Sequence, residues 1–273
     1  MRFTAFIAAA ATLACIAGAN AQETDGRQPF GKWLEDFRRD AAAQGISQRV
    51  LDEALSDIEP DEHVLELDQE QPESTLTLQQ YLKHLITKKM IRQAREHFQD
   101  NRALLKEIGK EYGVQPQYIV ALWGIESRYG THMGDDSTVQ SLATLAYDGR
   151  RAEFFRGELI DALTIIQQGH ISAANMTGSW AGAMGQCQFM PSSFLKYAVD
   201  ADGDGRKDIW GTKADVFASI ANYLHSEGWD PQKSWGSTKH PSNNFKILLK
   251  WNRSRYFATA VGMLADSIVK GKK

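Results

Sequence analysis

Apolar residues recur at helical spacing along most of the chain, and this pattern predicts a mainly α-helical protein with little β structure. Two helices are expected near the N-terminus, and Ser47 is a suitable N-cap for the second of them. The apolar positions that mark these helices are Trp33, Phe37 and Ala41, then Val50, Leu51, Ala54 and Leu55.

The segments that follow differ in pattern. Pro60 to Ser74 is acidic and irregular, whereas Leu78 to Gly109 shows long helical patterning. Tyr112-Gly113 through Pro116 punctuates this pattern before the next helix. Short strands are conceivable around Trp235 to Asn244, but nothing there alternates with a period of two.

A carboxylate interrupts the apolar face of the helix that follows Pro116. Ile119, Leu122, Trp123 and Glu126 fall at the i, i+3, i+4 and i+7 positions of one face. If Glu126 is buried there, desolvation raises its pKa above the ordinary value of roughly 4.3 and keeps the acid protonated near neutral pH. Such a group can act as a general acid. The alternative is that Glu126 lies on an exposed last turn and pairs with Arg128 or with a distant arginine.

Composition and charge bound the class of protein. The 273 residues are 42% hydrophobic and 24% charged, which is ordinary for a globular protein with one substantial core, or one core with a satellite. The formal net charge of −3 gives no support for nucleic-acid binding.

The first residues match a secretory signal peptide. Arg2 is followed by the apolar run FTAFIAAAATLACIAG and by Ala19-Asn20-Ala21, an A-x-A cleavage site. We therefore expect a signal peptide at residues 1–21, a mature chain from Gln22, and export to the periplasm. The run is too short for a confident membrane span, and no other segment approaches the roughly 20 apolar residues that a span requires.

The chain contains two cysteines, Cys15 and Cys187. A cysteine after an apolar run can be lipid-modified, but Thr12-Leu13-Ala14 lacks the aliphatic residue expected three places before such a cysteine. Ordinary cleavage is therefore favoured over lipid anchoring at Cys15. Cys187 would then be the remaining cysteine, unable to form an internal disulfide.

Residues 178–194, GSWAGAMGQCQFMPSSF, combine three glycines with aromatic, amide and hydroxyl groups. Glycines let backbone approach a ligand closely, and sugars suit aromatic faces and hydrogen-bonding side chains. The groups that could contact a sugar are Trp180 and Phe189 by packing, and Ser179, Gln186 and Gln188 by hydrogen bonds. The structural alternative is a glycine-rich turn between two helices, with Phe189 and Met190 in the core and Pro191 starting the next helix.

Residues 200–208, DADGDGRKD, reproduce the first half of an EF-hand loop. Asp200, Asp202 and Asp204 stand at positions 1, 3 and 5, and the carbonyl of Arg206 stands at position 7, a set of oxygens that suits Ca²⁺. Position 12, where a bidentate Glu belongs, is Gly211. The alternative is a solvated acidic turn; if Ca²⁺ binds, we expect a structural role.

Four ordered blocks of this sequence resemble the lytic murein transglycosylase B family, a lysozyme-like group of cell-wall enzymes. They are GIESRYG at 124–130, LATLAYDGRRAEFFRGEL at 142–159, GSWAGAMGQCQFMPSS at 178–193 and WNRSRYFATAV at 251–261. The likeness extends from about Leu78 to the C-terminus. It implies a goose-type lysozyme-like core at 78–273, with an N-terminal leader and helical region at 22–77 and an EF-hand-like loop at 200–215.

The resemblance implies cleavage of the β-1,4 bond between N-acetylmuramic acid and N-acetylglucosamine in peptidoglycan, with 1,6-anhydromuramic acid ends. Glu126 takes the part of the single acid and base, so no catalytic cofactor is expected. A hydrolase would need a second carboxylate. The candidates by sequence are Asp135, Asp136, Asp148, Glu153 and Glu158, of which Glu153 and Glu158 lie in a charge-mixed helical stretch and are expected to be solvated or salt-bridged.

Further positions carry over from the resemblance. The implied substrate-binding residues are Tyr81, Ser179, Gln188, Tyr223, Asn252 and Tyr256, each with a core-packing alternative. An acidic residue beyond the EF-hand-like pattern, here Asp215, is implied to close the loop. Longer relatives carry a small β domain between the positions of Trp229 and Trp251, where only a connection fits in this chain.

The sequence therefore predicts an exported lytic transglycosylase that acts on peptidoglycan strands. We expect a monomer that binds no nucleic acid and works beside cell-wall synthesis or division proteins. Two alternatives stay open: a hydrolytic muramidase, and a non-catalytic peptidoglycan-binding or scaffold protein that kept the groove.

Overall fold

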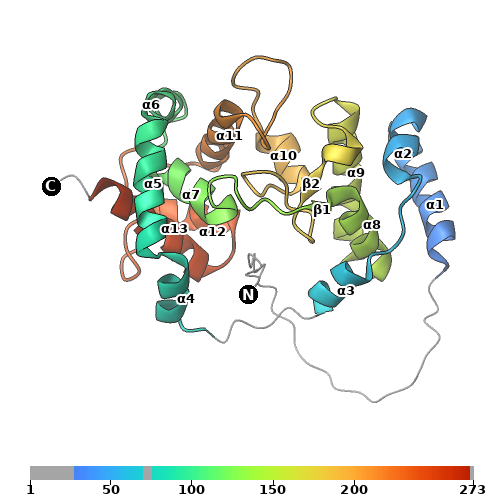
Figure 1. The fold of residues 1–273 in the computed structure, drawn as a ribbon, viewed down its shortest axis with the longest axis horizontal. Coiled ribbons are helices and arrows are strands. Elements are labelled where there is room, and N and C mark those ends of the chain that lie inside the picture. Colours follow the sequence, from blue (N-terminus) through green and yellow to red (C-terminus); the bar gives the residue numbers. More distant parts are fainter. Residues whose placement is uncertain (1–27, 70–75, 271–273) are drawn as a thin grey trace.

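The computed structural model describes residues 28–69 and 76–270, and within them the chain is almost entirely helical (Figure 1). The first seven α-helices are α1 (Phe30–Ala43), α2 (Gln48–Leu55), α3 (Glu62–Gln69), α4 (Leu78–Leu85), α5 (Lys88–Asp100), α6 (Arg102–Glu111) and α7 (Pro116–Ser127). The others are α8 (Thr138–Asp148), α9 (Ala152–Gln167), α10 (Pro191–Tyr197), α11 (Lys213–Ser226), α12 (Asn243–Trp251) and α13 (Arg255–Val269). The prediction of a mainly α protein is confirmed, whereas the predicted signal peptide and Cys15 lie outside the described residues.

Regular β structure in the described ranges is limited to two short strands. β1 (Asp136–Ser137) pairs antiparallel with β2 (Thr177–Gly178), and a 3-10 helix, η1 (Ala173–Asn175), precedes β2. The segment around Trp235 to Asn244, where the sequence showed no alternation with a period of two, contains one isolated bridge between Gly236 and Pro241.

Local capping explains where several helices begin. The Ser47 hydroxyl accepts a hydrogen bond from the Val50 amide, which confirms the predicted N-cap of α2. The stretch from Leu78 to Gly109 is divided into α4, α5 and α6. Thr87 separates α4 from α5, because it caps the new helix by accepting from the Met90 amide at 3.1 Å. Helical spacing of apolar residues alone did not reveal this break.

The acidic segment at 60–74 is not wholly irregular, because residues 62–69 form α3. Val64 is fully buried, and the buried Asp68 accepts from Arg150 Nε at 3.1 Å and from Arg151 Nη2 at 3.1 Å. Both arginines lie at the turn between α8 and α9. This tertiary ion-pair cluster stabilises a helix whose own sequence pattern is weak.

α7 lies at the centre of the helical assembly that carries the candidate site. It packs against α13, α5, α11 and α6, and its residues from Tyr118 to Gly124 are all buried. α8 and α9 pack on each other toward the other end of the molecule, where α3 contacts α8 and α2 contacts α9 (Figure 1). The strands and the glycine-rich segment lie between these two groups of helices, beside the C-terminal end of α7 (Figure 1).

The interval from Trp229 to Trp251 holds a short packed connection followed by α12. The Asn244 side chain donates to the carbonyls of Asp230 at 2.9 Å and Lys233 at 2.8 Å, which fastens the connection to the start of α12. The buried Trp235 donates its backbone amide to the Tyr118 hydroxyl on α7 at 2.9 Å. In the described part of the chain, none of the helices combines the length and the apolar character needed to cross a bilayer.

Candidate active site

Glu126 lies in the last turn of α7 and is buried, with 6% of its surface exposed. Ile119, Leu122 and Trp123, the other members of its predicted face, are buried as well, so the prediction of a carboxylate on the apolar face is confirmed. The alternative of an exposed Glu126 paired with Arg128 is wrong. Arg128 is exposed and its guanidinium contacts His132 at 3.3 Å.

Burial determines the protonation state of Glu126. Loss of solvent raises the pKa of its carboxyl to about 8, although a hydrogen bond from Trp251 lowers the pKa in part. The acid is therefore mostly protonated at neutral pH. Its charge, when formed, is felt by Tyr81, whose pKa is raised to about 12 chiefly by burial, and by the buried thiol of Cys187, whose pKa is also raised chiefly by burial.

The indole of Trp251 contacts Glu126 directly. Trp251 is the last residue of α12, and its Nε1 donates to Glu126 Oε1 at 2.5 Å. Its ring packs against the rings of Tyr223 at 4.6 Å and Phe189 at 5.3 Å. These three rings form one wall beside the carboxyl, which we call the aromatic wall.

The backbone turns sharply after Glu126. Arg128, Tyr129 and Gly130 have φ values of 47°, 61° and 82°, three consecutive residues in the left-handed region. Arg128 and Tyr129 carry a Cβ, so this backbone conformation costs each of them roughly 1–2 kcal/mol. Tyr129 is held in place by packing against Trp123, with ring centroids 5.2 Å apart. The turn ends α7 directly behind the carboxyl and fixes where Glu126 projects.

Three tyrosines predicted to bind substrate lie near Glu126. Tyr223, on α11, packs against Trp251, which in turn contacts Glu126. The Tyr223 ring is mostly buried, as the core-packing alternative expected. Tyr81, on α4, is half-buried and electrostatically coupled to Glu126. Tyr256, on α13, packs against Tyr81 with ring centroids 5.7 Å apart. Segments from three distant parts of the chain therefore converge on one carboxyl.

Asn252, another predicted substrate ligand, follows Trp251 at the turn between α12 and α13. Its Oδ1 accepts a hydrogen bond from the Ser254 amide at 2.9 Å. The side chain is half-buried and helps to shape the turn.

In the glycine-rich segment, the side chains predicted to bind substrate form hydrogen bonds with backbone groups in or beside the segment. Ser179 Oγ accepts from the Ala183 amide at 3.1 Å. Gln188 has a φ of 50°, and its amide nitrogen donates to the carbonyls of Met133 and Gly185, both at 2.9 Å. Both side chains are half-buried, so they keep some access to solvent.

Gln186 is committed to the protein interior. Its Oε1 accepts from Trp123 Nε1 at 2.7 Å, and its Nε2 donates to the Trp210 carbonyl at 2.7 Å. The expectation that Gln186 hydrogen-bonds sugar hydroxyls is therefore wrong, because both ends of its amide are used to fasten α7 to the segment before α11.

The three glycines of this segment lie close to other protein atoms, on the side where a Cβ would be. A Cβ on Gly178 would lie 2.3 Å from the Ala183 carbonyl oxygen, and one on Gly182 would lie 2.6 Å from Leu142. A Cβ on Gly185 would meet Ile209 at 2.8 Å. The structural interpretation of these glycines, with α10 starting at Pro191, is confirmed.

The other acidic candidates lie in different settings. Glu158 is buried, which contradicts the expectation that it is solvated, and its two oxygens accept from the amide and hydroxyl of Ser192 at 2.9 and 2.7 Å. Glu153 and Asp135 are exposed, whereas Asp136 on β1 and Asp148 at the end of α8 are half-buried. Among the described residues, none of these carboxylates contributes to the pKa of Glu126.

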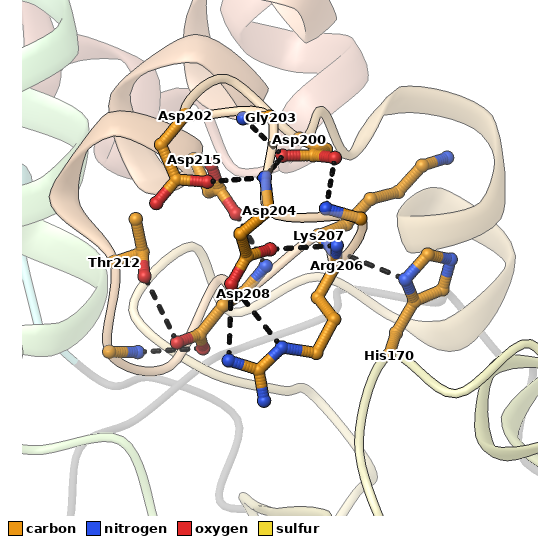
Figure 2. Close-up of polar contacts among 12 residues, drawn as sticks. His170, Asp200, Asp202, Gly203, Asp204, Arg206, Lys207, Asp208, Thr212 and Asp215 are labelled. Carbon is orange, nitrogen blue, oxygen red and sulfur yellow. Dashed lines mark hydrogen bonds and ion pairs between the residues drawn. The ribbon is translucent and has the colours of Figure 1, made fainter.

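The acidic loop brings its first three carboxylates together (Figure 2). Ligand oxygens of Asp200, Asp202 and Asp204 lie within 4.8 Å of one another. Asp200 accepts from the amides of Gly203 at 2.8 Å and Gly205 at 2.9 Å, so the loop curls around it. This clustering of hard oxygen atoms fits a divalent cation such as Ca²⁺.

The remaining predicted ligands of this loop have other contacts. Asp215 is fully buried at the start of α11, and one of its oxygens accepts from the Asp208 amide at 2.6 Å (Figure 2). Its other oxygen accepts from the Ala201 amide at 2.8 Å. The side chain of Arg206 pairs with Asp204 at 3.1 Å. Asp215 thus fastens the segment from Ala201 to Asp208 to the start of α11, and its role as a metal ligand stays a prediction.

Sequence reasoning missed the contact between Trp251 and Glu126. Trp251 begins one of the recognised blocks, but a tryptophan at the end of an amphipathic helix carries no signal of its hydrogen-bond partner. Its partner lies 125 residues away. The signal that could have raised the question is the burial of Glu126, because a buried carboxyl requires a partner.

Comparison with known proteins gives concordant results. Residues 29–242 match the family model described as transglycosylase SLT domain, which includes the N-terminal helices that the four sequence blocks did not reach. Over 195 residues the chain is 35% identical to membrane-bound lytic murein transglycosylase B of Escherichia coli (strain K12), covering 68% of this chain and 54% of that protein. The chain thus spans about half the length of this curated relative.

Solved structures share the fold. SltB3 from Pseudomonas aeruginosa, in complex with NAG-anhNAM-pentapeptide, superposes with a TM-score of 0.85 at 37% identity, covering 89% of this chain and 80% of that one. The Escherichia coli lytic transglycosylase Slt35 in complex with calcium gives a TM-score of 0.77 at 27% identity, covering 88% of this chain and 93% of that one. The lysozyme-like helical fold of these lytic transglycosylases is therefore the fold of this chain.

Proposed function

Because the chain belongs to the transglycosylase SLT domain family, we propose that it is a lytic transglycosylase acting on peptidoglycan. The bond cleaved is the β-1,4 bond between N-acetylmuramic acid and N-acetylglucosamine. The observation that carries this proposal is the buried Glu126, with a pKa of about 8 and an aromatic wall beside it. A neutral carboxylic acid next to flat apolar rings is suited to protonating a glycosidic oxygen.

The proposed reaction uses Glu126 twice. The protonated carboxyl first gives its proton to the glycosidic oxygen, while the bond from that oxygen to C1 of the muramic acid breaks and its electron pair stays with the leaving sugar. The carboxylate then accepts the proton of the C6 hydroxyl of the same muramic acid, whose oxygen closes a 1,6-anhydro ring on C1. No water is consumed, and Glu126 ends the cycle protonated.

The electrostatic setting of Glu126 supports a mechanism with one carboxylate. A retaining glycosidase needs a second carboxylate at about 5–5.5 Å, and an inverting one at about 6.5–9.5 Å. A neighbouring negative charge at such a distance raises the pKa of an acid. In the described part of the chain, burial alone raises the pKa of Glu126. Both oxygens of Glu158 accept hydrogen bonds from Ser192.

The substrate would lie along the surfaces that converge on Glu126. Tyr223 belongs to the aromatic wall, and Tyr81 and Tyr256 pack together near the carboxyl. Ser179, Gln188 and Asn252 are half-buried and keep polar atoms for sugar hydroxyls and acetamido groups. These six residues are our proposed substrate-binding set.

We also propose Ca²⁺ as a structural ion of loop 200–215. Asp200, Asp202 and Asp204 would supply carboxylate oxygens and Arg206 its carbonyl, with Asp215 at the base. The relative Slt35 is described in complex with calcium. Such an ion would neutralise the crowded carboxylates and stabilise the loop before α11, without taking part in the reaction.

The cellular setting follows from the substrate. Peptidoglycan lies outside the cytoplasmic membrane, so the proposal includes export through a signal peptide at 1–21, with cleavage favoured over lipid anchoring at Cys15. We further propose that the protein works as a monomer beside cell-wall synthesis or division proteins.

The test is the mass of the soluble products. Purified peptidoglycan is digested with the mature protein, and the released muropeptides are weighed by mass spectrometry beside those from a hydrolytic muramidase. A transglycosylase gives products lighter by one water than the hydrolytic ones. Hydrated products would mean a muramidase, and binding without products would mean a peptidoglycan-binding protein.

A further inference from the structure

The carboxyl of Glu126 has one hydrogen-bond donor in the described part of the chain. Trp251 Nε1 lies 2.5 Å from Oε1, whereas Oε2 has no protein partner there. The two oxygens of a carboxylic acid are chemically distinct, because one carries the proton and the other accepts hydrogen bonds. Which oxygen of Glu126 carries the proton is therefore determined by its surroundings.

An indole N–H donates and does not accept. Oε1 of Glu126 must therefore act as the acceptor in its contact with Trp251, and a proton on Oε1 would compete with that contact. The structure consequently favours the form with the acidic proton on Oε2. Among the described residues Oε2 has no protein partner, so its proton is the one available to a substrate atom.

We propose that Trp251 is a positioning residue that holds the acidic proton of Glu126 on Oε2 and thereby selects the oxygen that protonates the substrate. This inference rests on the proposed function and deepens it. After proton transfer the same N–H stabilises the negative charge of the carboxylate, so one donor serves both halves of the reaction.

The setting of Trp251 is built to hold its indole still. The Trp251 ring packs against the rings of Tyr223 and Phe189, with centroid separations of 4.6 Å and 5.3 Å. These contacts restrict rotation about the side-chain bonds of Trp251. The preceding residue, Lys250, forms an ion pair at 2.8 Å with Glu227, which lies just after α11. This exposed pair adds a contact between the ends of α12 and α11, and the ring packing keeps the N–H directed toward Glu126.

The titratable groups that interact electrostatically with Glu126 do not change their charge in the pH range where Glu126 titrates. Tyr81 on α4 has a pKa of about 12, and burial raises the pKa of Cys187 well above that of an ordinary thiol. Both groups are neutral where Glu126 titrates. Burial raises the pKa of Glu126 and the Trp251 hydrogen bond lowers it, so removal of the bond has a defined direction.

The first experiment replaces Trp251 with phenylalanine, which keeps an aromatic ring in the wall and removes the N–H. A charge-assisted hydrogen bond is strong enough that its loss should raise the pKa of Glu126 by about 1 to 2. We expect kcat to fall by roughly 10- to 100-fold with little change in KM, because proton transfer and not binding is affected. The alkaline limb of the pH–rate profile should move to higher pH.

Trp229→Phe is the matched control. Trp229 is also buried, and its Nε1 donates to Gln115 Oε1 at 2.6 Å, far along α7 from the carboxyl. This variant also loses an indole hydrogen bond, here to a neutral amide, and should keep the wild-type pH–rate profile. An unshifted profile in Trp251→Phe, or an equal shift in both variants, would overturn the proposal.

A second measurement needs neither turnover nor a change at Trp251. In ¹H–¹⁵N spectra of the free wild-type protein, the Trp251 indole signal should titrate with the midpoint of Glu126, near pH 8, and stay constant with pH in Glu126→Gln. A signal that is constant in the wild type would overturn the proposal even if Trp251→Phe fails to fold. A titrating signal in a protein without lytic activity would refute the proposed function and leave the Trp251 contact intact.

Discussion

The ring of Tyr129 lies directly over Gly124, one turn earlier in the chain. A Cβ on Gly124 would come within 2.6 Å of the Tyr129 ring carbons and 2.7 Å of its hydroxyl oxygen. Tyr129 can fold back in this way because the backbone after α7 enters the left-handed region at Arg128. The absence of a side chain at position 124 thus allows the sharp turn that ends α7 behind Glu126.

Gly124→Ala should destabilise the protein. An alanine within a helix ordinarily adds about 1 kcal/mol of stability relative to glycine, but here the overlap with Tyr129 reverses the sign. We expect the free energy of unfolding to fall by about 1 to 3 kcal/mol, measured by urea denaturation. Gly157→Ala on α9, where nothing lies within 4 Å of the new Cβ, is the control and should be neutral or stabilising. Equal effects of the two substitutions would contradict this interpretation.

The stability of the wild-type protein should depend on the ionisation of Glu126. Its pKa is about 8 in the folded state against an ordinary value of 4.5, so between these values the folded state holds a proton that the unfolded chain has lost. The free energy of unfolding therefore decreases as pH rises through this window, at up to about 1.4 kcal/mol per pH unit from this group, and levels off above it. Glu126→Gln lacks this contribution and should gain stability relative to the wild type from about pH 5 to pH 8. Denaturation curves of both proteins at several pH values test this, and a pH-independent difference would refute it.

Asp68 should contribute to the attachment of α3. It is 2% exposed and pairs with Arg150 and Arg151, so Asp68→Asn leaves two guanidinium groups without their carboxylate. Both arginines are partly exposed and can be solvated, so we expect a moderate loss of about 1 to 3 kcal/mol. Hydrogen exchange should accelerate in α3 before it does in α7. Asp40→Asn removes an exposed pair with Arg156 and should cost less than about 1 kcal/mol. A loss no larger in Asp68→Asn than in Asp40→Asn would exclude this role.

Removal of Ca²⁺ should lower the melting temperature if loop 200–215 holds the ion. At a concentration 100-fold above Kd, binding adds about 2.7 kcal/mol of stability, or a shift of roughly 5–10 °C for a domain of this size. Thermal unfolding is measured with EDTA and then with CaCl₂ in excess, with MgCl₂ as the comparison. The shift should be absent in Asp200→Asn and present in Asp135→Asn, whose carboxylate lies outside the loop. A wild-type melting temperature that is the same with EDTA and with CaCl₂ would refute the site.

The sequence predicted those features that depend on local pattern. The position of Glu126, three residues beyond Trp123 on an apolar face, raised the possibility of burial beside that of an exposed last turn, and the structure shows it buried. The start of α2 followed from Ser47. The class of fold followed from helical spacing repeated along the chain. In each case the information lies within one or two helical turns.

Features that depend on distant contacts could not be predicted in this way. The arginines that pair with Asp68 on α3 lie more than 80 residues away, and the donor to Glu126 comes from α12. The density of glycines at 178–185 indicated close approach, but only the fold shows that the approaching atoms belong to the protein itself. The substrate roles of Tyr81, Tyr256 and the other proposed ligands stay predictions, because burial and ring contacts are equally compatible with core packing.

We propose Glu126 as the sole acid and base of a transglycosylase. The most direct test compares peptidoglycan digestion by the wild type, Glu126→Gln and the exposed control Glu153→Gln, with the products weighed by mass spectrometry. We expect anhydro products from the wild type and from Glu153→Gln. In Glu126→Gln the rate should fall by at least about 10²- to 10⁴-fold, with retained binding to peptidoglycan. Release of the same products by Glu126→Gln at a comparable rate would contradict it.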